Sequence, residues 1–233
     1  MTAPALIAIS HGTSSAAGQA AVEALAAAVA AQLPDVMVRL GHVDVQQPDV
    51  AASLADIDEA QPVVIVPLLL SAGYHVRIDL KEQSAHRHNV TISPALGPDP
   101  RLVDALIARL APLNPAHADA IVLAVAGSSD ERANEDCRTI GRMLSERLDR
   151  AVTVGFLAAT EPRLGTALEA AREAGAERVV VANYLLAPGY FHDLATRLAE
   201  GAHVARPLLD DDEPAGELVA LVVDRYRSML PGD

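Results

Sequence analysis

The sequence predicts an α/β fold of two similar lobes, each a doubly wound parallel sheet covered by helices on both faces. Apolar runs of strand length alternate with longer segments of helical period along the 233 residues, and this alternation is typical of parallel sheets. The same order of motifs also occurs twice in the chain, which indicates an internal duplication.

The first half of the chain contains four predicted strands and four predicted helices. Short apolar runs predict strands at 6–9, 36–45, 62–70 and 90–93. Longer periodic segments predict helices at 16–32, 48–60, 74–87 and 100–110. Pro34 ends the first helix, Pro48 suits the first turn of the second, and Asp99 is a favourable N-cap for the fourth.

The second half repeats this order. Apolar runs predict strands at 120–126, 152–157, 178–184 and 203–205. Helices are predicted between and after them, at 131–148, 162–174, 188–199 and 216–229. Each lobe is therefore expected to contain four strands and four helices.

Three short motifs mark the duplication. Residues 11–14 (HGTS) match residues 126–129 (AGSS), 115 residues later. Gln47-Pro48 matches Glu161-Pro162 at an offset of 114, and SAGY at 71–74 matches APGY at 187–190 at an offset of 116. Each motif follows an apolar strand. We therefore divide the chain into two lobes, residues 1–113 and residues 114–233.

Composition and charge exclude several classes of protein. The formal net charge of −13 disfavours binding to nucleic acid or to an anionic membrane surface. The N-terminus lacks a basic region before its short apolar run, so we expect no signal peptide and a soluble, cytoplasmic protein. The single cysteine, Cys137, cannot hold an iron–sulfur cluster, and we expect it to be a buried apolar residue. Because one chain supplies both lobes, we expect a monomer.

Polar residues follow three strands of the first half. His11 comes directly after the first strand, Asp44 ends the second, and His75 lies shortly after the third. Ligands of open parallel sheets bind beyond the carboxyl ends of the strands. Two imidazoles and a carboxylate suit a divalent transition metal, and histidine can also act as a general base. Solvated loop residues are the alternative for each position.

One face of the second predicted strand changes from apolar to polar residues along its length. Val36, Val38, Leu40, His42 and Asp44 share one face at period two. Three apolar residues followed by two polar ones indicate either a lined cavity at the strand's end or a strand that emerges into solvent.

The segment after His75 is locally basic. Residues 74–88 contain three Lys or Arg and two acids, in a chain that is otherwise acidic. A basic region beside the candidate site would suit an anionic small molecule. A solvated helix face is the alternative. In the second half, Ala126, Ala158 and Phe191 replace the three polar residues. That lobe is therefore expected to act as a wall or lid, with His192 as a further candidate residue.

The first half resembles a known enzyme family in two motifs. Residues 6–13 (LIAISHGT) and 63–80 (VVIVPLLLSAGYHVRIDL) are similar to the two signatures of the class II tetrapyrrole chelatases, the CbiX/SirB-like sirohydrochlorin ferrochelatases and cobaltochelatases. LGPDP at 96–100 is also similar to that family. The second half resembles it more loosely, as a degenerate copy.

The resemblance implies a bilobal fold with a cleft between the lobes and a function, the insertion of Fe²⁺ into sirohydrochlorin for siroheme synthesis. It assigns His11 and His75 to the metal site, with Asp44 where the family usually has glutamate, one methylene longer. We expect these three to be both catalytic and metal-binding. The expected substrate-binding residues are Ser10, Thr13, Ser14, Gly73, Tyr74 and Arg77. Of these, Arg77 and the three hydroxyls suit the tetrapyrrole carboxylates.

Three alternatives remain open from the sequence. The metal could be Co²⁺, for cobalamin synthesis, because affinity order alone does not select the ion. A histidine phosphatase would have Arg before the histidine, where this chain has Ser10. A non-catalytic protein that binds metal or tetrapyrrole would retain the ion. We expect no permanently bound cofactor, and a divalent metal and a tetrapyrrole as the substrates.

Overall fold

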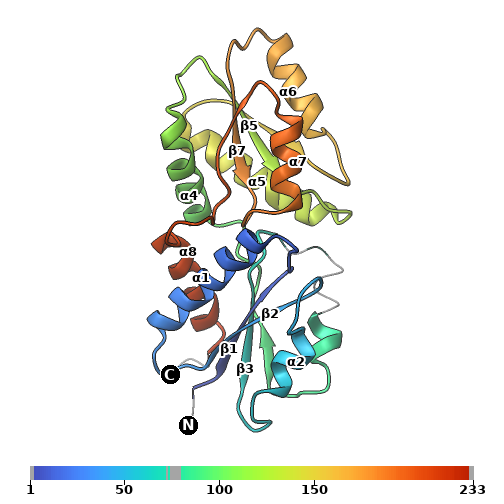
Figure 1. The fold of residues 1–233 in the computed structure, drawn as a ribbon, viewed down its shortest axis with the longest axis vertical. Coiled ribbons are helices and arrows are strands. Elements are labelled where there is room, and N and C mark those ends of the chain that lie inside the picture. Colours follow the sequence, from blue (N-terminus) through green and yellow to red (C-terminus); the bar gives the residue numbers. More distant parts are fainter. Residues whose placement is uncertain (1–2, 72, 74–79, 231–233) are drawn as a thin grey trace. The chain divides into compact units, whose positions relative to one another are not determined.

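The computed structural model describes residues 3–71, 73 and 80–230 (Figure 1). The chain forms two compact units. Unit 1 comprises Met1–Leu96 and Asp211–Asp233, and unit 2 comprises Gly97–Asp210. Each unit contains one four-stranded sheet in which all described pairings are parallel, so the predicted α/β class is confirmed.

Unit 1 has the strand order β2-β1-β3-β4. Its strands are β1 (Ala5–Ser10), β2 (Val38–His42), β3 (Val63–Pro67) and β4 (Val90–Ile92). One face of the sheet is covered by α1 (Ala16–Gln32) and α8 (Gly216–Arg227), and the other by α2 (Val50–Ala55) (Figure 1). The central position of β1 explains why all six of its residues are buried.

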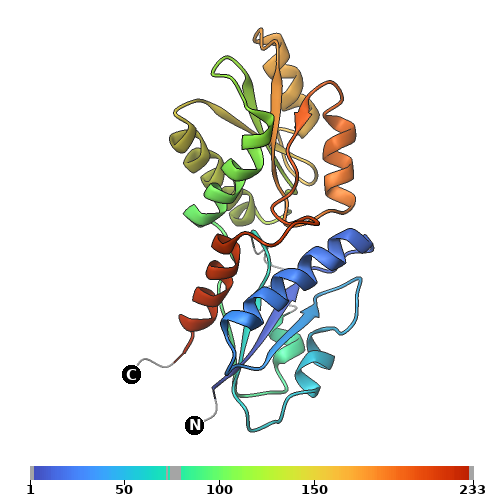
Figure 2. The same cartoon turned by 60° about the vertical axis from the view of Figure 1, so that its left-hand side comes forward.

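The period of β1 divides its side chains between the two faces. Ala5, Ile7 and Ile9 pack in one apolar cluster with residues of α2 and β3, such as Leu54 and Ile65. On the other side, α1 lies against α8 (Figure 2). Alanine-rich helices pack closely because their side chains are small. A doubly wound sheet of this kind leaves the carboxyl ends of its strands for binding.

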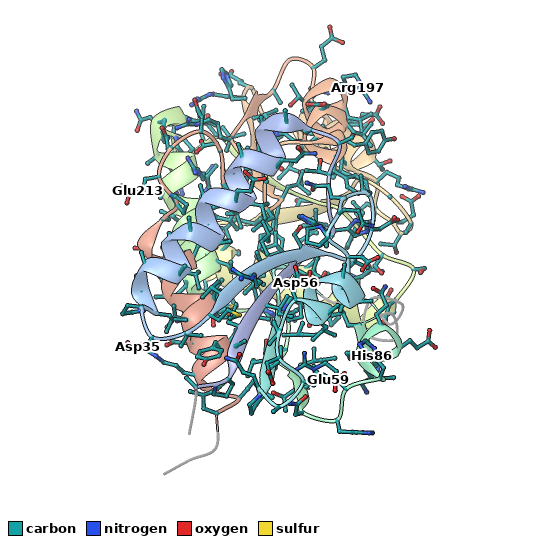
Figure 3. The ribbon with its side chains drawn as sticks, turned by 60° about the horizontal axis from the view of Figure 1, so that its bottom comes forward. Asp35, Asp56, Glu59, His86, Arg197 and Glu213 are labelled. Atoms are coloured by element: carbon teal, nitrogen blue, oxygen red, sulfur yellow. The ribbon has the colours of Figure 1, made fainter. Side chains whose placement is uncertain are left out.

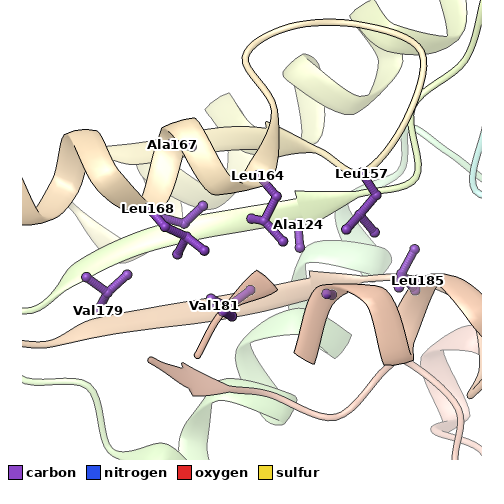
Figure 4. Close-up of a cluster of buried hydrophobic side chains, with 11 residues drawn as sticks. Ala124, Leu157, Leu164, Ala167, Leu168, Val179, Val181 and Leu185 are labelled. Carbon is purple, nitrogen blue, oxygen red and sulfur yellow. The ribbon is translucent and has the colours of Figure 1, made fainter. Parts of the chain in front are cut away.

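Unit 2 repeats the arrangement with the order β6-β5-β7-β8. Its strands are β5 (Ala120–Val125), β6 (Val152–Phe156), β7 (Val179–Tyr184) and β8 (His203–Val204). Its helices are α4 (Pro100–Leu110, followed by a 3₁₀ turn at Ala111–Leu113), α5 (Glu131–Leu148), α6 (Leu164–Glu173) and α7 (Tyr190–Leu198). Figure 4 shows α6 residues Leu164 and Leu168 packed on Ala124 and Val181 of the sheet.

The compact units differ from the sequence boundary placed after residue 113. Helix α4 belongs to the first repeat by sequence, but it packs on α5 and β7 of unit 2. Helix α8 belongs to the second repeat, but it packs on α1 and β3 of unit 1. The Tyr226 hydroxyl of α8 donates to the Pro4 carbonyl at 2.6 Å, and Arg225 donates to the Ala95 and Leu96 carbonyls. Each unit is therefore completed by the last helix of the other repeat.

Several element boundaries are shorter than predicted. The helix predicted at 48–60 is α2, Val50–Ala55, because Asp49 is its N-cap and accepts from the Ala52 amide. The strand predicted at 36–45 is Val38–His42. The helix predicted at 74–87 falls partly outside the described residues, and residues 80–84 are helical.

Two further features concern the described part of the chain. Cys137 is buried in α5, as predicted. Across residues 3–71, 73 and 80–230, no helix combines the length and the apolar character that crossing a bilayer requires.

Candidate metal and substrate site

The carboxyl edge of the unit 1 sheet brings together two of the three predicted metal ligands. His11 directly follows β1, and its side chain is exposed. Asp44 lies two residues beyond β2, the neighbour of β1, and is also exposed. His75 lies outside the described residues. The strand that precedes His75 in sequence, β3, is the other neighbour of β1, so the three predicted ligands follow three adjacent strands.

A close backbone contact joins the His11 and Asp44 turns. The Asp44 amide donates to the His11 carbonyl at 3.1 Å. Gly12 has a φ of +92°, and a Cβ at this position would lie 2.0 Å from the Asp44 carbonyl oxygen. Only glycine fits both the left-handed backbone and this approach. The glycine after His11 is therefore what allows the His11 and Asp44 turns to meet.

The Asp44 carboxylate is held by its own turn. Its Oδ1 accepts from the Val45 amide at 2.7 Å, and Val45 has a φ of +66° and is 57% exposed. Ala159, the corresponding residue of unit 2, has a φ of +65°, so this uncommon backbone conformation belongs to the duplicated turn. This hydrogen bond orients the carboxylate through Oδ1. The second oxygen, Oδ2, takes no part in it and is the atom that could bind a cation.

Two glutamines hold the loop that follows His11. The Thr13 amide donates to Gln46 Oε1 at 2.9 Å, and Gln19 Nε2 donates to the Thr13 carbonyl at 2.8 Å. Neither glutamine was among the predicted site residues. The available signal was the position of Gln46, two residues after Asp44 in the same turn.

The predicted substrate-binding residues differ in their surroundings. At the loop after His11, Ser14 is exposed, and the Thr13 hydroxyl accepts from the Ser15 amide at 3.1 Å. Gly73 is partly exposed, and Tyr74 and Arg77 lie outside the described residues. Ser10 is only 5% exposed, and its hydroxyl is bonded within the protein.

His42 and Asp44 do not share one face as the strand period predicted. Strand β2 ends at His42, which is buried, whereas Asp44 is exposed beyond it. His42 Nδ1 lies 2.8 Å from Ser10 Oγ. Burial lowers the pKa of His42 below its ordinary value, against a smaller opposite effect of the Glu23 charge. His42 is thus a buried, hydrogen-bonded residue behind the site.

Arg87, in the basic segment after His75, does not lie beside the site. Arg87 donates to backbone carbonyls that precede β3, at Leu54, Ile57, Asp58, Glu59 and Gln61. This is the amino-terminal edge of the sheet, opposite the edge of His11. Figure 3 shows His86 and Glu59 in the same region of unit 1. Arg87 is therefore a structural residue, and of the two alternatives for the basic segment, a region beside the site does not hold for Arg87.

Unit 2 has apolar residues at the corresponding positions. Ala126 and Ala158 occupy the positions of His11 and Asp44 and keep their backbone hydrogen bond, at 2.9 Å.

Two other groups were candidates outside this edge of the sheet. His192 is partly buried, and its Nδ1 lies 2.7 Å from Asn183 Nδ2. Among the described residues, the grouping of three possible ligands within 4.8 Å is Asp210–Asp212, and Asp210 is bonded to Arg109 and Arg206.

The fold and this edge define a class of protein: a duplicated parallel α/β chelatase fold with an imidazole and a carboxylate on adjacent strand ends of one unit. The chain belongs to the CbiX family, whose model matches residues 5–113 and 120–211. A sirohydrochlorin ferrochelatase of Priestia megaterium is 32% identical over 136 residues, which are 54% of this chain and 51% of that protein. The chain thus matches about half the length of this curated relative.

Two solved structures are similar over nearly the whole chain. SirB from Bacillus subtilis with Fe³⁺ has a TM-score of 0.82 and 17% identity, covering 97% of this chain and 94% of SirB. CbiX, described as the terminal enzyme of siroheme biosynthesis in denitrifying bacteria, has a TM-score of 0.71 and 22% identity, covering 97% of this chain and all of CbiX. At these identities the likeness establishes the fold.

Proposed function

We propose that this protein is a sirohydrochlorin chelatase, a lyase-class enzyme that inserts a divalent metal into the tetrapyrrole. The observation that carries the proposal is the pair of exposed groups on joined turns, the His11 imidazole and the Asp44 carboxylate. Membership of the CbiX family and the name of the Priestia megaterium relative support the choice of substrate. Fe²⁺ is the favoured ion, and Co²⁺ is the alternative.

The two groups suit metal transfer better than metal storage. Imidazole nitrogen and carboxylate oxygen bind iron and cobalt, and a site with two or three protein ligands stays open to a second partner. His75, outside the described residues, is the proposed third ligand. Such a site can strip water from the ion and still release it to four pyrrole nitrogens.

Proton balance assigns a second role to histidine. Insertion of a dication displaces two pyrrole N–H protons, which must be accepted before or during metal transfer. A neutral imidazole accepts a proton near neutral pH. We therefore assign His11 and His75 as proton acceptors, with Asp44 supplying the negative charge that offsets the incoming ion.

The substrate's carboxylates require donors around the same edge. Ser14 and the Thr13 loop follow His11 on the way to the N-terminus of α1, where amides and hydroxyls suit anions. Gly73, Tyr74 and Arg77 are proposed on the side of β3. Arg87 is not included, since its guanidinium is bonded to backbone carbonyls.

An anaerobic absorbance assay with sirohydrochlorin and Fe²⁺ or Co²⁺ tests the proposal. His11→Ala, Asp44→Ala and His75→Ala should each slow insertion by about 100-fold or more, because each removes a ligand or a proton acceptor. His86→Ala, an exposed histidine at the opposite sheet edge, is the matched control and should insert metal at the wild-type rate.

The outcomes separate the candidate functions. If the wild type inserts either metal faster than the buffer blank, the faster metal distinguishes the siroheme from the cobalamin role. If it inserts neither but binds metal tightly, the protein is a metal-binding protein, and the enzyme proposal fails. If His11→Ala retains full activity, the assignment of this edge fails.

A further inference from the structure

We propose that Ser10 and His42 are a buried pair of positioning residues that holds the His11 turn in the geometry needed for metal binding. Ser10 is the last residue of β1 and His42 the last residue of β2, and they are direct partners in the parallel register. Each is 5% exposed. This inference rests on the proposed metal site and changes the expected role of Ser10 from substrate contact to support.

The hydrogen bonds link this pair to both ligand-bearing turns. Ser10 Oγ lies 2.8 Å from His42 Nδ1 and accepts from the Gly12 amide at 3.2 Å. The Ser10 carbonyl accepts from the Val43 amide at 2.9 Å. The serine hydroxyl therefore bridges the residue after His11 to the strand end that leads into Asp44.

Two hydrogen bonds hold the Ser10 hydroxyl in place. The Gly12 amide can only donate, so Ser10 Oγ accepts from it, whereas the direction of the bond between Ser10 Oγ and His42 Nδ1 depends on which ring nitrogen carries the hydrogen. In either direction the two bonds fix the position of Oγ, and this position restrains the Gly12 amide.

Unit 2 shows that the fold does not require this pair. The corresponding register partners are Val125 and Phe156, both buried and apolar. The backbone contacts are nevertheless kept: Leu157 donates to the Val125 carbonyl at 2.9 Å. Burying a hydroxyl and an imidazole costs free energy that valine and phenylalanine do not cost. The polar pair occurs in the unit that carries His11 and Asp44, which supports a role in the site.

Residues that orient metal ligands typically change metal affinity or activity by 10- to 100-fold when they are removed. The test installs the apolar pair of unit 2 in unit 1, as the double variant Ser10→Val/His42→Phe, alongside Ser10→Ala. Ser10→Thr is the conservative variant, because it keeps the hydroxyl. Ser93→Ala is the control, since Ser93 is also buried in unit 1 but lies at the end of β4, across the sheet from β2.

Two readouts are measured on the whole protein: Co²⁺ affinity by anaerobic absorbance titration, and kcat and KM for insertion into sirohydrochlorin. We expect the double variant and Ser10→Ala to weaken Co²⁺ binding by about 10-fold and to lower kcat with little change in the KM for sirohydrochlorin. Ser10→Thr should restore most of the affinity, and Ser93→Ala should match the wild type.

The readouts distinguish failure of this inference from failure of the proposed function. A wild type that binds Co²⁺ but does not insert it contradicts only the proposed function, and the titration still tests the pair. Co²⁺ affinity and kcat within twofold of wild type in Ser10→Ala, a variant with minimal risk of misfolding, would overturn the positioning role. A wild type that binds no Co²⁺ would overturn it as well.

Discussion

The two units use the same turn after their first strand, although only unit 1 has a histidine directly after that strand. Gly12 and Gly127 have φ values of +92° and +85°, and a Cβ would lie 2.0 and 2.1 Å from the carbonyl oxygens of Asp44 and Ala158. Both turns are followed by an N-capped helix, with Ser15 and Asp130 as the caps. The turn geometry is therefore a property of the duplicated fold.

The side chains on that shared backbone differ. His11 and Asp44 in unit 1 correspond to Ala126 and Ala158 in unit 2. Behind them, the polar pair of Ser10 and His42 corresponds to an apolar pair. The backbone frame therefore forms without the proposed metal-binding residues, so the proposed chemistry depends on a few side chains that only one copy of the frame carries.

The means of holding the loop also differ. Unit 1 uses Gln46 and Gln19 to bond the Thr13 amide and carbonyl. In unit 2, Asn134 makes both contacts, to the Ser128 amide and carbonyl at 2.9 Å each. Asn134 is 2% exposed. Unit 2 therefore holds its loop with one buried residue, and unit 1 with two.

The largest effect is expected from alanine at the shared glycines. Gly12→Ala and Gly127→Ala should each lower the free energy of unfolding by about 3 kcal/mol, since both force a Cβ against a carbonyl oxygen at positive φ. Urea denaturation measures this loss. At a temperature where both variants are folded, Gly12→Ala alone should lose metal insertion. Equal loss of insertion in both variants would contradict the assignment of the site to unit 1.

A smaller loss of stability is expected from removing the side chains that hold the two loops, Gln46 and Gln19 in unit 1 and Asn134 in unit 2. Asn134→Ala leaves two backbone groups without their partner and should cost about 2 kcal/mol, whereas Gln46→Ala and Gln19→Ala should cost about 1 kcal/mol each. The measurement is urea denaturation, with Thr139→Ala, on the exposed side of α5, as the control. If Gln46→Ala lowers the free energy of unfolding as much as Asn134→Ala does, the loop of unit 1 is not held by two glutamines in equal measure.

The dependence of stability on pH should distinguish His42 from its apolar counterpart Phe156. Because burial lowers the pKa of His42 from 6.5, the unfolded chain binds this proton at a higher pH than the folded protein does. The stability that depends on neutral His42 is fully present above pH 6.5, and it is lost as the pH decreases toward the pKa of His42 in the folded protein. Between about pH 7.5 and about pH 5, His42→Phe should therefore lose less stability than the wild type.

Denaturation of both proteins across this pH range measures the difference. The control is His86→Ala, which removes an exposed histidine. Parallel stability curves for the wild type and His42→Phe would show that His42 is solvated or charged in the folded protein.

The smallest effect is expected at Asn183, the position of unit 2 that corresponds to Pro67 in β3. Asn183 is fully buried, and its Oδ1 has no hydrogen-bond partner among the described residues. An apolar residue of similar shape removes this unsatisfied atom, which offsets the lost contact to His192. Asn183→Leu should change the free energy of unfolding by less than about 1 kcal/mol.

Asn134→Leu is the matched comparison, because Asn134 is a buried asparagine whose amide is fully engaged. It should cost clearly more than Asn183→Leu in the same denaturation experiment. A loss of stability at Asn183→Leu as large as that at Asn134→Leu would indicate that Asn183 has a role that its contacts do not show.

The sequence determined the order of strands and helices and the position of the candidate site. Three motifs at nearly constant offset gave the duplication, and the matching glycine turns confirm it. Because parallel strands end at the same edge, the residues after β1 and β2 had to lie together, and His11 and Asp44 do. Local patterns were sufficient here because the relevant geometry follows from strand direction and sheet order.

The tertiary structure decided the rest, because those features depend on partners that are distant in sequence. Period two placed His42 on a face of β2, but only packing against Ser10, 32 residues away, buried it. The charge of Arg87 was visible, whereas its carbonyl partners, up to 33 residues away, were not. The assignment of α4 and α8 to units depended on which sheet their apolar faces cover, and a helix's own period does not specify the surface that buries it.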